Sequence, residues 1–165
     1  MNDADPDRPV GFRRVADTLQ ALGHGHAPRW LEVAARTSQQ AADALGVAVG
    51  QIAKSVVLRR VADDAAVLVI ASGLRRVDEA QVGALAGGKL ARADANFVRL
   101  HTGFAIGGVA PIAHPQPLFT LIDRELFGFD EIWAAAGHPH GVFRLTPHDL
   151  VRMTGASVVD VGSAS

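Results

Sequence analysis

Two neighbouring apolar runs set the strongest constraint on the fold. Ile52–Leu58 and Ala65–Ala71 each have the length of an ordinary β-strand and are rich in valine and isoleucine, which favour strands. The polar turn Ala62-Asp63-Asp64 separates the two runs. The pattern therefore predicts two strands joined by a turn, so the chain must build at least one β-sheet.

Helices and further strands are predicted on both sides of this pair. Cap residues, apolar spacings of three and four, and stopping glycines predict helices at Val10–Leu22, Ser38–Leu45, Asp78–Leu85, Asp94–His101 and Thr146–Met153. Short β-like runs predict strands at Trp30–Ala34, Leu118–Ile122, Glu131–Ala136, Val142–Leu145 and Val158–Val161. In the first helix, Val15, Leu19 and Leu22 are expected to share one face.

The short elements follow one another without an internal repeat or a separating linker. A length of 165 residues suits one ordinary domain, and an apolar content of 48% is enough to bury a core. We therefore expect one compact α/β or α+β domain over residues 10–165, preceded by a flexible polar leader at residues 1–9.

The composition argues against several classes of protein. No apolar run approaches the ~20 residues that span a membrane, and the acidic start lacks the pattern of a signal peptide, so a cytoplasmic protein is expected. The absence of cysteine excludes disulfides, thiolate metal sites and a cysteine nucleophile. A net charge of −1 predicts that any nucleic-acid partner is held over a small footprint, such as a strand end.

Lys54 is the first candidate functional residue. It is the one charged residue in the run Ile52–Leu58, and the period of two places it on one face with Ile52, Val56 and Leu58. A structural interpretation is a lysine whose ammonium reaches solvent along an apolar surface. The functional interpretation is a cation in a cleft that holds a phosphate or a carbonyl oxygen.

The segment Thr102–Pro111 is the second candidate. Its three glycines, Gly103, Gly107 and Gly108, allow close approach of a ligand to the backbone, and the proline fixes the local turn. Such a segment is either an ordinary turn or a shaped loop that presents backbone groups to a substrate. The glycine spacing is not that of a dinucleotide-binding fingerprint.

Histidine pairs are the third candidate. His138-Pro139-His140 lies between two predicted strands, and His24-Gly25-His26 is a similar pair. Either pair is able in principle to bind a metal, but no His-Glu-x-x-His pattern accompanies them, so we expect no metal and no cofactor. No Gly-x-Ser-x-Gly motif marks a nucleophilic serine. A single pocket histidine, His138, is the favoured interpretation.

Taken in order, these features resemble the YbaK/prolyl-tRNA-editing superfamily. The segments that carry the resemblance are Ile52–Val57, Gly103–Pro111 and Ala136–Pro139, and the similarity extends over roughly residues 28–160. The family includes the inserted editing domain of bacterial prolyl-tRNA synthetases and free-standing deacylases. Its fold implies a mixed β-sheet, curled or partly barrel-like, surrounded by helices.

The resemblance also implies a reaction and a set of site residues. The reaction is hydrolysis of the ester that joins a wrong amino acid to the terminal adenosine of a tRNA, most simply tRNA-Pro carrying a small amino acid. The implied catalytic residues are Lys54, Gly107, Pro111 and His138, and the implied substrate-binding residues are Ser55, Thr102, Gly103 and Gly108. The implied partners are the acceptor end of an aminoacyl-tRNA and prolyl-tRNA synthetase.

Two expectations about geometry follow. Lys54 and the loop Thr102–Pro111 should line the same cleft, although some fifty positions separate them. A side chain added at Gly107 should hinder the reaction by filling space beside the substrate.

Two other functions stay open at this point. Residues 38–52 mimic a helix-turn-helix of a DNA-binding protein, with a recognition helix that would begin near Ala48. A domain that docks on a synthetase or a tRNA without catalysis is the other alternative. The amino acid removed, the tRNA and the oligomeric state are not predicted.

Overall fold

A computed structural model describes residues 7–164, and residues 1–6 of the predicted leader lie outside the described part. The helices are α1 (Val10–Ala21), α2 (Ser38–Leu45), α3 (Glu79–Leu85), α4 (Ala95–Thr102) and α5 (Pro147–Thr154), with 3-10 turns η1 (Val49–Gln51) and η2 (Arg124–Gly128). All five helices were predicted. The caps formed by Thr37, Asp78, Asp94 and Thr146 each accept a backbone N–H, as their positions indicated.

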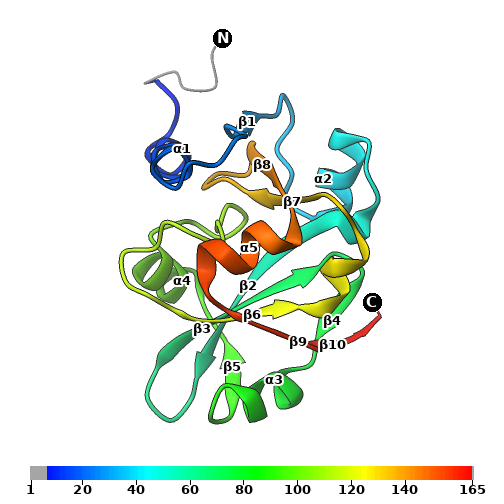
Figure 1. The fold of residues 1–165 in the computed structure, drawn as a ribbon. Helices are drawn as coiled ribbons and strands as arrows, with labels where there is room; N and C mark the ends of the chain where they lie inside the picture. The colour runs from blue at the N-terminus through cyan, green and yellow to red at the C-terminus, as the bar shows by residue number, and fades with distance from the viewer. Residues whose placement is uncertain (1–6, 165) are drawn as a thin grey trace.

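The strands make one mixed sheet and a small two-stranded sheet. They are β1 (Arg29–Trp30), β2 (Ile52–Arg60), β3 (Ala65–Ser72), β4 (Arg75–Val77), β5 (Leu90–Arg92), β6 (Phe119–Asp123), β7 (Ile132–Ala135), β8 (Gly141–Leu145), β9 (Ser157–Val159) and β10 (Gly162–Ala164). The large sheet runs in the order β1-β8-β7-β2-β3-β6-β9, with β5 paired to β2, and β10 pairs with β4. A mixed α/β domain is therefore confirmed (Figure 1).

Strand β2 lies at the centre of the large sheet, and one of its two edges is divided between two partner strands. The other edge pairs with β3 along residues 53–60. On the divided edge, Ile52 and Ala53 pair with β7 in parallel, whereas residues 58–60 pair with β5. Within the described part of the chain no strand pairs with residues 54–57 on that edge. The sheet therefore opens beside Lys54.

Apolar side chains cover both faces of the sheet. Leu68 and Ile70 of β3 belong to the largest cluster with α1, α4 and α5, while Val67 and Val69 belong to a second cluster with α3. Burial on both faces explains why β3 is apolar throughout rather than alternating. In Figure 1, α3 lies at the far end of the molecule from α1.

Helix α1 packs against the turn that follows β7. Its buried residues are Phe12, Val15 and Leu19, whereas Leu22 is 51% exposed. Leu22 caps the helix with an αR backbone, and its N–H donates to the carbonyl oxygen of Thr18 at 3.0 Å, so it keeps the helical register but is not covered as Val15 and Leu19 are. A methyl group at Gly11 would overlap the carbonyl oxygen of Gly137.

The structure rules out the helix-turn-helix interpretation. After α2 and its αL cap at Gly46, Val49–Gln51 forms a single 3-10 turn, and β2 begins at Ile52. No recognition helix is present where one was required. The strand expected at Trp30–Ala34 is also shorter, since β1 ends at Trp30. Among the described residues, no helix is long and apolar enough to cross a membrane.

The contact between Gly11 and Gly137 yields a stability prediction. Alanine at Gly11 gains at most ~1 kcal/mol in helix propensity, but it must displace a backbone carbonyl, and overpacking of this kind costs ~1–3 kcal/mol. Gly11→Ala should therefore lower the free energy of unfolding, measured by urea denaturation. Gly25→Ala is the matched control, because a methyl group there meets nothing within 4 Å. Equal midpoints for the two variants would show that α1 is not closely packed on Gly137.

Candidate active site

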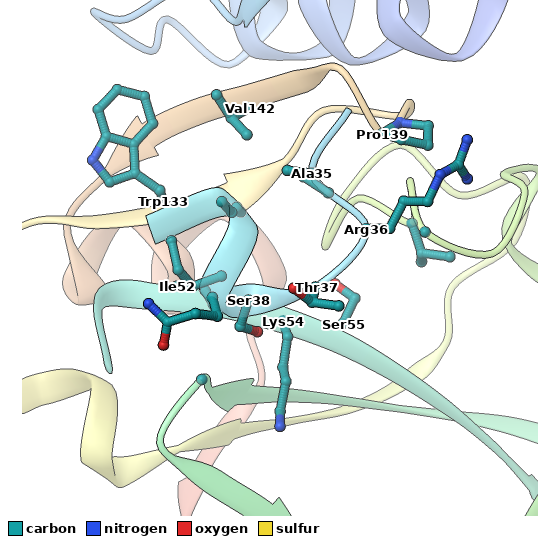
Figure 2. A pocket seen from close by; sticks show the side chains of 18 of the residues that line it. Ala35, Arg36, Thr37, Ser38, Ile52, Lys54, Ser55, Trp133, Pro139 and Val142 are labelled. Atoms are coloured by element: carbon teal, nitrogen blue, oxygen red, sulfur yellow. The ribbon is translucent and has the colours of Figure 1, made fainter. Parts of the chain in front are cut away.

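A pocket lies where the sheet opens beside β2. It has a volume of about 680 Å³, within the range of small-ligand sites. Its walls come from the start of α2, from β2, from β7, from the loop that follows α4 and from the turn after β7 (Figure 2). Of the eight predicted site residues, Lys54, Ser55, Gly107 and His138 line the pocket. Lys54 and the glycine loop therefore share one cleft, as expected.

Lys54 reaches from β2 toward the start of β4. Its Nζ donates a hydrogen bond to the backbone carbonyl oxygen of Arg75 at 2.6 Å. Burial lowers the pKa of Lys54, and the negative charge of Asp123 opposes that shift. In Figure 2 the side chain is extended, with the amine at its far end. The group is thus only partly in solvent and able to bind an anion in the pocket.

Asp123 is a buried carboxylate near Lys54 that sequence reasoning missed. The side chain is 2% exposed, and its two oxygens accept the backbone N–H groups of Ser72 and Glu125 at 3.0 and 2.9 Å. Those bonds fix the negative charge in place. The available signal was a carboxylate at the end of an apolar run, Leu121-Ile122-Asp123.

Ser55 contributes a hydroxyl with no internal partner. Its Oγ is buried and makes no hydrogen bond within the described part of the chain. Buried hydroxyl groups are normally hydrogen-bonded, so an unsatisfied one beside a pocket is available to a ligand or a water molecule. Thr37, which precedes α2, lines the same pocket.

The glycine loop approaches the His138 turn closely. Gly107 has φ +92°, a conformation that glycine adopts easily, and the N–H of Gly108 donates to the carbonyl oxygen of Ala105 at 3.1 Å. A side chain at Gly108 would lie 2.7 Å from the Cα of His138, whereas one at Gly107 would meet only Pro139, at 3.7 Å. Within the protein a methyl group at Gly107 therefore has room, so a clash with bound substrate stays a prediction, and the positive φ adds a constraint from the backbone conformation.

The other predicted site residues are not among those that line the pocket. Thr102 is fully buried, and its hydroxyl donates to the carbonyl oxygen of Val98 and accepts from the N–H of Phe104. Gly103 caps α4 with φ +77°. Gly108 is packed against His138, and Pro111 is buried. These four residues shape the loop, and a direct role in binding stays a prediction.

Arg14 of α1 holds the same loop from outside the pocket. Its guanidinium donates to the carbonyl oxygen of Gly103 at 2.9 Å and lies over the ring of Phe104, 4.5 Å from its centre. Helix α1 also contacts Gly137 through Gly11. It therefore packs against both the glycine loop and the turn that carries His138.

His138 lines the pocket from the turn that follows β7. Its ring stacks on Trp30 with centroids 4.8 Å apart. Burial lowers the pKa of His138, and the neighbouring His140 and Arg36 lower it further. Within residues 7–164, no group of three or more His, Cys, Asp or Glu side chains is placed to hold a metal ion.

Several lining residues were not predicted as site residues. Arg36 and Thr37 precede α2, and Arg36 carries an exposed cation at the edge of the pocket (Figure 2). The sequence signal of Thr37 was interpreted only as a helix cap. Trp133 and Pro139 complete the apolar part of the wall.

Comparisons with known proteins agree with this architecture. Residues 32–153 match the family model of the aminoacyl-tRNA editing domain. The crystal structure of a candidate trans-editing enzyme for prolyl-tRNA synthetase is similar with a TM-score of 0.88 and 40% identity, over 96% of this chain and 100% of that one. The hypothetical protein APE2540 gives a TM-score of 0.84 and 29% identity, over 91% and 99% of the two chains. The uncharacterized protein YwhH of Bacillus subtilis is 32% identical over 133 residues, 79% of this chain and 83% of that protein.

The fold and the site together define a class of protein: a mixed α/β domain with a pocket at the divided edge of its central strand β2. The chain belongs to the family of aminoacyl-tRNA editing domains. The resemblance carried by the Lys54 strand, the glycine loop and the His138 turn is confirmed at the level of the family. Helix α1 lies before the part that matches the family model.

The environment of Lys54 predicts its titration. Because burial disfavours the charged form, the pKa of Lys54 should lie below ~10.4, the ordinary value for lysine. The chain has two lysines, so NMR of ¹³C-labelled lysine gives two signals, which Lys54→Arg and Lys89→Arg assign. Asp123→Asn removes the opposing charge and should lower the pKa of Lys54 further. A pKa at or above ~10.4, or a rise in Asp123→Asn, would contradict this account of the pocket.

Proposed function

We propose that the protein is a trans-editing deacylase that hydrolyses the ester of a mischarged tRNA, most simply tRNA-Pro carrying a small amino acid. The observation that carries the proposal is the meeting of Lys54, Gly107 and His138, from three separate segments, in one pocket of an editing-domain chain. A site of about 680 Å³ suits an amino acid and its adenosine rather than a long stretch of nucleic acid.

The chemistry needs only water as co-reactant. The oxygen of a water molecule attacks the ester carbonyl carbon, and the carbonyl oxygen becomes an oxyanion. The bond to the ribose oxygen then breaks, the free amino acid leaves, and the proton released by the water ends on the ribose hydroxyl. Because an aminoacyl ester is already activated, donors for the oxyanion and a positioned water suffice, and an adjacent ribose hydroxyl supplies the base. One such donor is typically worth ~3–4 kcal/mol in the barrier.

The residues of the pocket divide these tasks. The Lys54 amine, which also donates to the Arg75 carbonyl oxygen, holds a negatively charged oxygen of the terminal nucleotide. Backbone groups of the loop at Gly107 face the oxyanion, and the Ser55 hydroxyl, which has no partner in the described chain, is free to bind substrate or water. Second-site hydrolysis is useful because a synthetase separates side chains that differ by one methylene by only ~1–3 kcal/mol.

The charge of the protein supports a small footprint on the tRNA. A net charge of −1 does not favour a broad grip on the phosphate backbone, so only the acceptor end enters the site. Arg36, exposed at the edge of the pocket, is placed to meet a phosphate of that end. Prolyl-tRNA synthetase is the proposed source of the mischarged tRNA and a partner, which places the reaction in the cytoplasm.

Lys54 is the residue whose replacement tests the proposal. Lys54→Ala should lower deacylation of alanyl-tRNA-Pro at least 100-fold with little change in the urea midpoint, because a cation at a pocket wall contributes more to binding than to packing. Lys54→Arg should restore little, since a planar guanidinium differs in shape and hydration from an ammonium. Lys89→Ala, which removes an exposed lysine outside this pocket, is the control and should keep wild-type turnover. Normal turnover in Lys54→Ala would refute the proposal, and binding without cleavage by the wild-type protein would favour a docking domain.

The conformation of Gly107 gives a second test. Gly107→Ala should lower turnover more than ~10-fold, about 1.4 kcal/mol in the barrier, because a left-handed residue with a side chain shifts the loop. Gly155→Ala is the control: it has φ +66°, open space around it and a place at the end of α5. Both variants should lose ~1–2 kcal/mol of stability, but only Gly107→Ala should lose turnover. Equal turnover in the two variants would remove the loop from the mechanism.

A further inference from the structure

The imidazole of His138 is held in a fixed orientation. Its ring stacks on Trp30, and the ring of His140 also stacks on Trp30, with centroids 5.0 Å apart and planes 7° apart. The guanidinium of Arg8 covers Trp30 as well, 4.4 Å from the ring centre. These contacts restrict rotation of the His138 ring, so its two nitrogens have distinct surroundings.

One of those nitrogens is occupied by the backbone. The N–H of His140 donates to Nδ1 of His138 at 3.1 Å. With the ring turned over, a carbon would stand in place of Nδ1 and the N–H of His140 would lose this partner. A nitrogen that accepts an N–H carries no proton itself. In the neutral imidazole the proton of His138 is therefore on Nε2.

The neighbouring histidine makes this arrangement rigid. Nδ1 of His140 lies 2.6 Å from the carbonyl oxygen of Leu31, and since a carbonyl only accepts, that Nδ1 carries a proton. The N–H of Leu31 donates in turn to the carbonyl oxygen of His140. The backbone of His140 is thereby tied to the segment after β1, which keeps its N–H directed at His138.

Protonation of His138 would break this arrangement. A charged imidazole carries a proton on both nitrogens, so Nδ1–H would face the N–H of His140. Arg36 near the ring and Arg8 above Trp30 are cations, and they also oppose a positive charge on His138. The neutral ring with Nε2–H is therefore the form in the pocket at neutral pH.

We propose that His138 acts as a hydrogen-bond donor, through Nε2–H, to an oxygen of the bound aminoacyl ester, and that the His140 N–H fixes this tautomer. The inference rests on the proposed function and narrows it: His138 does not remove the proton from the attacking water. Its backbone lies against Gly108, so the donor stands on the same wall as the glycine loop. The Nε2–H of His138 and a backbone N–H of the glycine loop then both donate to the bound ester.

Three variants separate a donor from a base. His138→Gln keeps an N–H near the position of Nε2, His138→Asn places its amide near that of Nδ1, and His138→Ala removes both. We expect kcat/KM for alanyl-tRNA-Pro within ~3-fold of wild type in His138→Gln and at least tenfold lower in the other two. The pH profile of His138→Gln should keep the shape of the wild-type profile. A base role predicts instead that His138→Gln is as impaired as His138→Ala and loses the limb of the profile that the histidine caused.

Nitrogen NMR tests the tautomer without any turnover. In ¹⁵N-labelled protein, the His138 signals, identified by their absence in His138→Gln, should show a protonated Nε2 and an unprotonated Nδ1. Binding of alanyl-amide adenosine, in which an amide replaces the ester, should shift the Nε2–H signal. A protonated Nδ1 on His138 would overturn the donor role of Nε2–H and would leave the proposed deacylase function untouched. The expected tautomer in a protein that neither binds the analogue nor cleaves an ester overturns the proposed function and the role of the donor together.

Discussion

The division of one edge of β2 between β7 and β5 is the constraint on which the pocket depends. Four residues in the middle of that edge have no strand beside them in the described chain, and Lys54 is the first of them. A partly buried cation is costly unless polar groups surround it. The Arg75 carbonyl oxygen, at the start of β4, and the buried charge of Asp123, at the end of β6, meet that requirement. The gap in pairing thus leaves room for the pocket, while neighbouring strands stabilise its cation.

Helix α1 shows that the site depends on residues that precede the part matched by the family model. It precedes the matched residues 32–153, yet Gly11 contacts the base of the His138 turn and Arg14 holds the base of the glycine loop. Trp30, just before the matched segment, supports the His138 ring. The positions of the loop and of the imidazole are therefore set by residues whose own side chains are not among those that line the pocket.

Local signals in the sequence were sufficient for the helices and for the central pair of strands. Thr37, Asp78 and Asp94 mark caps because their side chains satisfy N–H groups within one turn, which depends little on the rest of the fold. The short strands β4, β5 and β10 were missed because three residues carry no periodicity, and distant partners define them. Asp123 and Arg36 were missed for the same reason, since only the folded chain brings them beside Lys54 and the pocket.

In the proposed function, this pocket hydrolyses wrong aminoacyl esters and spares the correct one. The most direct test of this function is the deacylation rate of the purified wild-type protein on a panel of tRNA-Pro charged with alanine, with other small amino acids and with proline. We expect that at least one small amino acid is released far faster than by spontaneous hydrolysis, while prolyl-tRNA-Pro is left intact. Rates equal to the spontaneous ones for every member of the panel, or equal acceleration for proline, would contradict it.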